Sequence, residues 1–120
     1  MDKSYGKEKR MDENASNYID ITYGERLDSN GYAPSLLNNE DETCYFGCGG
    51  ETVRHEVFFG PNRTNSKRTG MWVYVCTLCH DEIHHTDGVK DRRLKREAQE
   101  AFEKVRSHED FIAIFGKNYL

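Results

Sequence analysis

Four cysteines fall into two short pairs that could hold one metal ion. Three residues separate Cys44 from Cys48, and two residues separate Cys76 from Cys79. Each pair can supply two sulfur ligands from a single turn of chain, and two such pairs complete the tetrahedral thiolate shell of a structural zinc site. Two disulfides or four free buried thiols are the alternatives. Glycines beside the first pair, and the position of the second between a strand and a helix, favour zinc.

Histidines form a second group that could do chemistry. His80 follows Cys79 directly and His84 comes four residues later, so on a helix the two share one face. His55 reaches the same place if its strand packs against that helix. Three imidazoles can hold a divalent cation and leave positions open for water and a phosphate. In the alternative interpretation His80 only caps the cysteine turn, while His84 and His85 lie on the surface; the spacing favours the metal site.

Two strands and three helices are expected to position these residues. Alternating β-branched and aromatic residues predict the strands. Apolar residues at helical spacing predict the longest helix, and Ser107 with Asp110 resembles a capping box that opens the last one before Gly116 ends it. The predicted elements are strands at 52–59 and 71–75, a long basic loop at 61–70, and helices at 76–85, 91–106 and 111–115.

Composition indicates a small domain that needs stabilisation beyond its hydrophobic core. Charged residues are 32% of the 120-residue chain and the hydrophobic set only 36%, so the apolar core is modest and a metal would stabilise it. Residues 1–43 are polar and predicted to be a flexible N-terminal segment, with the zinc-binding domain at 44–120. Neither a signal peptide nor a membrane span is predicted. We therefore expect a cytoplasmic protein with reduced cysteines and no membrane partner.

Basic residues gather at two places although the net charge is −4. The 61–70 loop contains Arg63, Lys67 and Arg68 without an acidic residue, and a second group lies at 92–96. Such patches can contact phosphates. On charge alone, a solvated loop and a solvated helix face are the favoured explanation of both patches.

The order of these motifs resembles the HNH nuclease family, and in particular the small HNH-like proteins of bacteriophages and prophages. The resemblance covers roughly residues 44–120. It rests on the cysteine pairs, the strand Arg54-His55-Glu56-Val57-Phe58-Phe59-Gly60, the run Val75-Cys76-Thr77-Leu78-Cys79-His80, His84, and the tail Phe115-Gly116-Lys117-Asn118-Tyr119-Leu120.

This resemblance implies an α+β fold: a zinc-stabilised ββα-metal domain, treble-clef-like, with C-terminal helices. It implies a metal-dependent DNA endonuclease or nickase, phage-encoded, with phage or host proteins as further partners. By the family's pattern His55, His80 and His84 would bind a catalytic Mg²⁺, Mn²⁺, Ni²⁺ or Zn²⁺, with Glu56 as general base. The phosphate contacts would come from Arg63, Lys67 and Arg68.

Two positions depart from the family's pattern. The base position holds Glu56 where a histidine is usual, so His55 is the alternative base. Met71 stands where the family has its middle asparagine, and Asn62 or Asn65 could supply that amide. A non-catalytic zinc-binding module that contacts nucleic acid or protein is therefore the main alternative function. A redox disulfide switch is less well supported, because the cysteine spacing already suits one ion.

Overall fold

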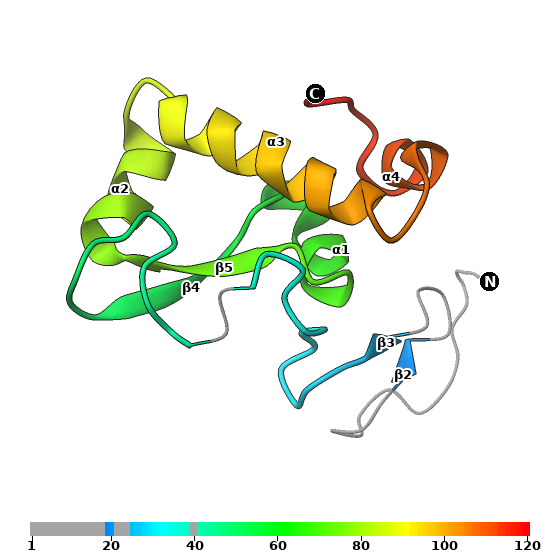
Figure 1. The fold of residues 1–120 in the computed structure, drawn as a ribbon, viewed down its shortest axis with the longest axis horizontal. Coiled ribbons are helices and arrows are strands. Elements are labelled where there is room, and N and C mark those ends of the chain that lie inside the picture. The colour runs from blue at the N-terminus through cyan, green and yellow to red at the C-terminus, as the bar shows by residue number, and fades with distance from the viewer. Residues whose placement is uncertain (1–18, 21–24, 39–40) are drawn as a thin grey trace.

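A computed structural model of the chain describes residues 19–20, 25–38 and 41–120. Within these ranges the protein is a small α+β fold, as the sequence predicted (Figure 1). Its elements are β2 (Ile19–Asp20), β3 (Glu25–Arg26), β4 (Thr52–Glu56), the 3-10 turn η1 (Gly60–Asn62), α1 (Arg63–Arg68), β5 (Trp72–Cys76), α2 (Thr77–His85), α3 (Val89–Glu103) and α4 (His108–Phe115). The antiparallel pairs are β2 with β3 and β4 with β5. Most of residues 1–24, part of the predicted flexible segment, lie outside the described residues.

The β4–β5 hairpin has two faces that carry different side chains. Its register runs from Thr52 opposite Cys76 to Glu56 opposite Trp72. Because side chains alternate along a strand and directly opposite residues share a face, His55 lies on one face together with Val73. Glu56 and Trp72 lie on the other. We call these the inner and outer faces.

The first strand is shorter than predicted, and the predicted loop contains a helix. Strand β4 ends at Glu56, although the backbone N–H of Val57 still donates to the carbonyl of Met71 at 3.0 Å. The chain then turns through η1 into α1. Buried Ser66 on α1 accepts from the N–H of Phe58 and donates to the carbonyl of Met71. These two hydrogen bonds join α1 to the chain beside both strands. Because a polar side chain anchors this helix, its sequence has no hydrophobic periodicity from which α1 could be predicted.

Helices α2, α3 and α4 cover the inner face (Figure 1). Helix α3 runs from Val89 to Glu103, close to the predicted range. Ser107 caps α4 by accepting from the N–H of Asp110 at 3.0 Å, and Gly116 ends it with a φ of 80°, as predicted. The buried core between the hairpin and these helices consists of Cys44, Val57, Phe58, Met71, Val73, Val75, Cys76, Cys79, Ile83, Leu94, Ala98, Phe102, Phe111 and Phe115.

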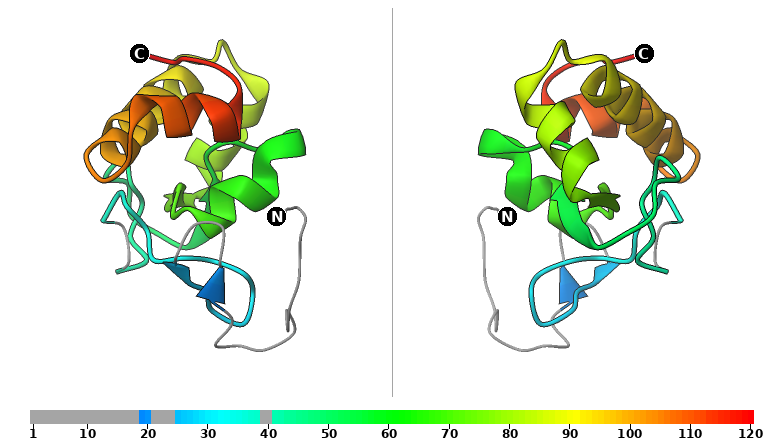
Figure 2. Two further views of the ribbon diagram at one scale, coloured as in Figure 1. Left: turned by 90° about the vertical axis from the view of Figure 1, so that its right-hand side faces the viewer. Right: turned by 90° about the vertical axis from the view of Figure 1, so that its left-hand side faces the viewer.

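The described stretch 25–38 lies across the outer face, opposite α3 and α4 (Figure 2). The indole N–H of Trp72 donates to the carbonyl of Ala33 at 2.7 Å, and the hydroxyl of Ser35 donates to the carbonyl of Trp72 at 2.8 Å. These bonds cover Trp72, which is only 5% exposed. None of the helices in the described ranges is long and apolar enough to cross a membrane.

Candidate metal centres

The four cysteines lie together at one end of the hairpin and can hold a metal ion. One sulfur atom from each residue lies within 4.8 Å of the other three. The Sγ of Cys79 is 3.9 Å from that of Cys44 and 3.5 Å from that of Cys48. The four cysteines form no disulfide, and Cys48 is exposed, so the arrangement disfavours two disulfides and four buried thiols and is compatible with the predicted metal site.

Two turns position these sulfurs. In the first, the N–H of Gly47 donates to the carbonyl of Cys44, and Gly47 takes a φ of 87° that favours glycine. In the second, Cys76 is the N-cap of α2, and its sulfur accepts from the N–H of Cys79 at 3.4 Å. The first turn is tied to α3, because the hydroxyl of Tyr45 donates to a carboxylate oxygen of Glu97 at 2.6 Å.

The surroundings of the cluster favour at least one thiolate. Burial raises the pKa of the Cys44 thiol, but hydrogen bonds from three backbone N–H groups of the two turns outweigh burial and lower this pKa to about 6. For Cys79, burial and hydrogen bonds with the neighbouring thiols raise the pKa. Four thiols in contact cannot all ionise without a cation, and a bound metal supplies that charge.

The three predicted histidines form a second cluster, separate from the cysteines. His55 comes from the inner face of β4, and His80 and His84 lie one turn apart on α2, which packs on that face. One ring nitrogen from each lies within 4.8 Å of the other two. The ring centroids are 5.4 Å apart between His55 and each helix histidine, and 4.7 Å apart between His80 and His84.

Burial keeps this cluster in a form that can bind a metal ion. His55 is 2% exposed, and its buried Nε2 has no hydrogen-bond partner within the described part of the chain. A buried polar atom without a partner costs free energy, and a metal ion would satisfy it. Burial, followed by the neighbouring imidazoles, lowers the pKa of His55 to about 3 and also lowers that of His84. Neutral imidazole is the form that binds metals.

One side of the histidine cluster is open to solvent. His80 is half-buried and His84 exposed, so water or a substrate can reach the cluster. The ring of Phe59 packs against the cluster, with its centroid 4.8 Å from that of His84 and 5.7 Å from that of His55. His85 stays outside the cluster, with its Nε2 3.7 Å from a carboxylate oxygen of Asp81.

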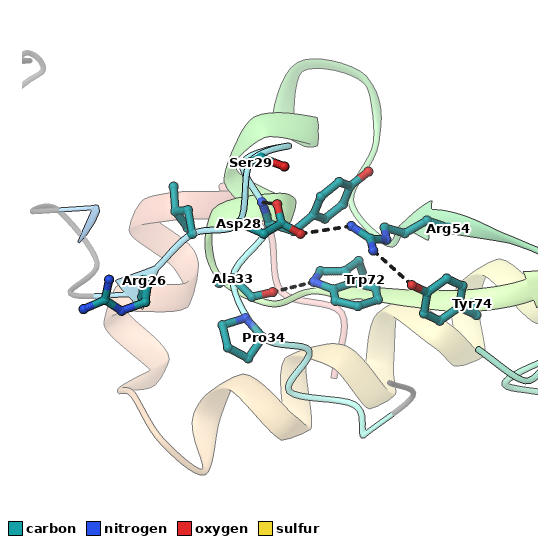
Figure 3. A pocket seen from close by; sticks show the side chains of 10 residues that line it. Arg26, Asp28, Ser29, Ala33, Pro34, Arg54, Trp72 and Tyr74 are labelled. Carbon is teal, nitrogen blue, oxygen red and sulfur yellow. Dashed lines mark hydrogen bonds and ion pairs between the residues drawn. The ribbon is translucent and has the colours of Figure 1, made fainter. Parts of the chain in front are cut away.

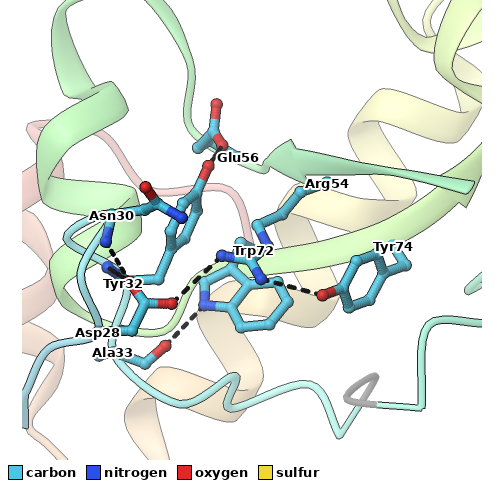
Figure 4. Close-up of polar contacts among 8 residues, drawn as sticks. All are labelled: Asp28, Asn30, Tyr32, Ala33, Arg54, Glu56, Trp72 and Tyr74. Carbon is cyan, nitrogen blue, oxygen red and sulfur yellow. Dashed lines mark hydrogen bonds and ion pairs between the residues drawn. The ribbon is translucent and has the colours of Figure 1, made fainter.

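Glu56 does not face the histidine cluster. Although it follows His55 in sequence, it lies on the outer face and is 9% exposed. The hydroxyl of Tyr32 donates to one carboxylate oxygen, and Arg63 Nε lies 3.2 Å from the other (Figure 4). Both oxygens of the predicted base are therefore held by other side chains.

The outer face also carries an open pocket of about 590 Å³. Figure 3 shows Arg54 between Trp72 and Tyr74, with the described N-terminal stretch forming the opposite wall. The guanidinium carbon of Arg54 is 4.1 Å from the ring centroid of Tyr32 and 4.5 Å from that of Trp72, and its nitrogens bond Tyr74 and Asp28. Arg54 therefore already has partners within the protein.

The predicted phosphate-contacting residues are all on α1. Arg63 pairs with Glu56, and Lys67 lies 4.8 Å from the ring centroid of Tyr32, so both extend toward the outer face. Arg68, in the last turn of α1, is half-buried. The structure therefore joins α1 to the Tyr32 side more closely than to the histidines, although Arg63 is near enough to contribute to the low pKa of His55.

Neither predicted asparagine supplies an amide to the histidines. The side-chain amides of Asn62 and Asn65 donate to the carbonyls of Phe115 and Ile114, both at 3.3 Å, and so hold the end of α4. Met71 is fully buried in the core. The family's middle amide therefore has no equivalent near the cluster among these candidates.

No protein-family model matches this chain, and no curated protein or solved structure matches it either. The two clusters therefore stand on the geometry of this chain alone. The sequence predicted six of the seven cluster residues from spacing, and His55 from the expected packing of its strand against the helix. It missed Tyr32, the partner of Glu56, because no local pattern links a tyrosine in a polar stretch to a strand 24 residues later.

Proposed function

We propose that this protein is a metal-dependent endonuclease or nickase of the HNH type that hydrolyses DNA phosphodiester bonds, built on a zinc-stabilised ββα-metal domain. The observation that carries the proposal is the convergence of His55, His80 and His84 around a buried nitrogen without a partner. The family resemblance adds the reaction class, DNA as substrate and a phage origin.

Zinc is the metal that best fits the cysteine cluster. Tetrahedral zinc with sulfurs at about 2.3 Å requires sulfur–sulfur separations of about 3.8 Å. The separations of 3.5 and 3.9 Å around Cys79 agree with this value. We assign this ion a structural role, because four thiolates fill its coordination shell and leave no position for a substrate.

In the proposed reaction the histidine cluster holds the catalytic cation. His55 provides the buried Nε2, and His80 and His84 provide the solvent-facing side. A divalent cation bound there supplies positive charge to the scissile phosphate and to the leaving 3′ oxygen. His55 itself is buried, and electrostatic interactions are stronger in such low-dielectric surroundings.

Proton transfer is the weak step of this site. The low pKa of His55 makes it a poor proton acceptor at neutral pH, and the carboxylate of Glu56 is held on the outer face by Tyr32 and Arg63. Of the two candidates from sequence, neither is placed as a strong base. We therefore expect slow nicking rather than rapid double-strand cleavage.

The test is plasmid nicking by zinc-loaded protein with added Mg²⁺, Mn²⁺ or Ni²⁺. We expect metal-dependent conversion of supercoiled to open-circular DNA, lost in His80→Ala and in His84→Ala. His85→Ala is the matched control, since His85 is on the same helix but outside the cluster, and it should keep the wild-type rate. Wild-type nicking rates in all three variants would show that the histidine cluster is not part of the proposed site.

A non-catalytic zinc module is the second candidate, supported by the buried Met71 and the constrained Glu56. Its signature is a protein that holds one zinc, binds DNA or a protein, and shows no nicking with any of the three cations.

A further inference from the structure

A second basic surface lies beside the histidine cluster, between α3 and the C-terminal residues. It is a pocket of about 390 Å³ with six lining residues: Asp91, Arg92, Lys95, Arg96, Lys117 and Tyr119. We call it the α3–tail pocket. Four of these residues are cations and one is a carboxylate, so its lining carries an excess of three positive charges.

The α3–tail pocket is held in shape by buried Gln99. Its side-chain oxygen accepts from the N–H of Tyr119 at 2.7 Å, and its amide donates to Asn118 at 2.8 Å. Gly116, with its φ of 80°, turns the chain back toward α3 just before these contacts. The tail is therefore fixed against α3, and Lys117 is brought over the cations of the helix.

Within the described residues, three of the four cations make no ion pair. Lys95 pairs with Asp91 at 2.9 Å, and Arg92 donates to the carbonyl of Asp87 at 3.2 Å. In the described part of the chain, Arg96 and Lys117 make no ion pair; Lys117 only approaches the Tyr119 ring, at 5.3 Å. Like charges that face one cavity repel each other, and an anion between them removes that cost.

The α3–tail pocket is also next to the histidines. Lys95 Nζ lies 4.5 Å from the ring centroid of Phe59, and that ring contacts His84 at 4.8 Å. The charge of Lys95 contributes to the lowered pKa of both His55 and His84. The pocket is therefore close enough for its charge to act on the histidines, whereas Arg63 and Lys67 of α1 extend toward Glu56 and Tyr32.

We propose that the α3–tail pocket binds a backbone phosphate of the nucleic-acid strand that passes the histidine cluster. This inference rests on the proposed function, which makes that strand the substrate. It moves the main phosphate contact from α1, where the sequence placed it, to Arg96 and Lys117. An extended strand fits better than a free phosphate, because Lys95 of the pocket contacts Phe59, which in turn contacts His84 of the candidate metal site.

The experiment measures DNA binding without cleavage. Zinc-loaded protein, with no other divalent metal, is titrated into 5′-labelled single-stranded and duplex oligonucleotides and followed by fluorescence anisotropy over a range of salt. The test variant is Arg96→Ala/Lys117→Ala. The control variant, Arg93→Ala/Lys104→Ala, removes the same charge outside the pocket. All four side chains are exposed, and circular dichroism checks that both variants fold.

We expect the test variant to bind about tenfold more weakly at physiological salt. Its salt slope should fall by about 0.7 to 0.9, the value for one lost phosphate contact. The control variant should stay close to wild type. Equal losses in both variants would mean that only net charge matters and would overturn the proposal, as would wild-type binding by the test variant.

A competition experiment distinguishes a nucleic-acid strand from a small phosphate as the ligand of the pocket. If inorganic phosphate or a nucleoside monophosphate binds the pocket as tightly as the oligonucleotide does, the strand proposal is wrong. The two proposals also fail separately. Nicking that depends on His80 but is unaffected by Arg96→Ala/Lys117→Ala removes the pocket and keeps the nuclease. DNA binding that depends on Arg96 and Lys117, without any nicking, would keep the pocket and remove the nuclease.

Discussion

Replacement of Cys79 by serine should unfold this domain, whereas replacement of the next residue, His80, should not. Cys79 is 1% exposed and its sulfur contacts those of Cys44 and Cys48. A serine hydroxyl does not replace a thiolate as a zinc ligand, so Cys79→Ser leaves three ligands and loses most of the metal affinity. His80 belongs to the other cluster and is half-buried.

The magnitude follows from the size of the chain. A 120-residue protein has a free energy of unfolding of about 6 to 18 kcal/mol. A structural zinc site contributes about 10 to 16 kcal/mol of folding free energy. Loss of the zinc therefore removes most or all of the stability. For His80→Ala we expect a loss of about 1 kcal/mol or less, which lowers the melting temperature by about 3 to 6 °C.

The assay combines bound zinc by elemental analysis with thermal unfolding followed by circular dichroism. Wild-type protein and His80→Ala should each retain one tightly bound zinc and a cooperative transition; Cys79→Ser should show neither. Chelation of zinc from the wild type should reproduce the variant, and added zinc should restore only the wild type. A Cys79→Ser protein that melts like wild type without zinc would refute the assignment of the cysteines as the structural metal site.

Three further predictions concern single residues. His55 has a folded pKa of about 3 against an ordinary value of 6.5, so the unfolded chain binds a proton that the folded chain does not; the free energy of unfolding should fall as pH drops from about 6.5 to 3 and be level above. Urea titrations across this range should show a flatter profile for His55→Gln, and identical profiles would contradict the burial of a neutral imidazole. Glu56→Gln should slow nicking by far less than the roughly 100-fold or greater loss that follows removal of a general base; a loss of that size would show that Glu56 takes the proton after all. Gly70→Ala should destabilise by about 2 kcal/mol or more, because a Cβ would lie 2.2 Å from the carbonyl oxygen of Pro34 at a φ of 77°. Gly116→Ala is its control in thermal unfolding, since it has a similar φ of 80° and nothing within 4 Å, and an equal cost for both would mean that the Pro34 contact is absent in solution.

The sequence predicted the parts of the fold that have hydrophobic periodicity or a helix-capping residue. Apolar spacing located α3, and Ser107 with Gly116 located α4 to within a few residues. It did not predict α1, because the residue that anchors this helix is the polar Ser66. Hydrophobic periodicity cannot detect a helix held by side-chain hydrogen bonds to the neighbouring strands.

The metal-binding residues were predictable because ligand spacing is a local property. Cys76 and Cys79, or His80 and His84, reach one point from a single turn of chain. The orientation of Glu56 depended instead on strand alternation. Neighbours in a strand point to opposite faces, so His55 and Glu56 cannot both face α2 while β4 stays regular through residue 56.

The geometry of the histidine cluster should depend on the cysteine cluster, but the cysteine cluster should not depend on the helix histidines. Cys76 and Cys79 fix the first turn of α2, and the same helix carries His80 and His84 against β4. Loss of a metal at the cysteines should loosen the start of α2 against the hairpin, so the helix histidines should lose their position relative to His55. The reverse should not follow for His80 and His84, because these are half-buried and exposed and lie outside the cysteine cluster. Binding of a catalytic metal should therefore be lost together with a structural zinc, while the zinc should persist in the His80 and His84 variants.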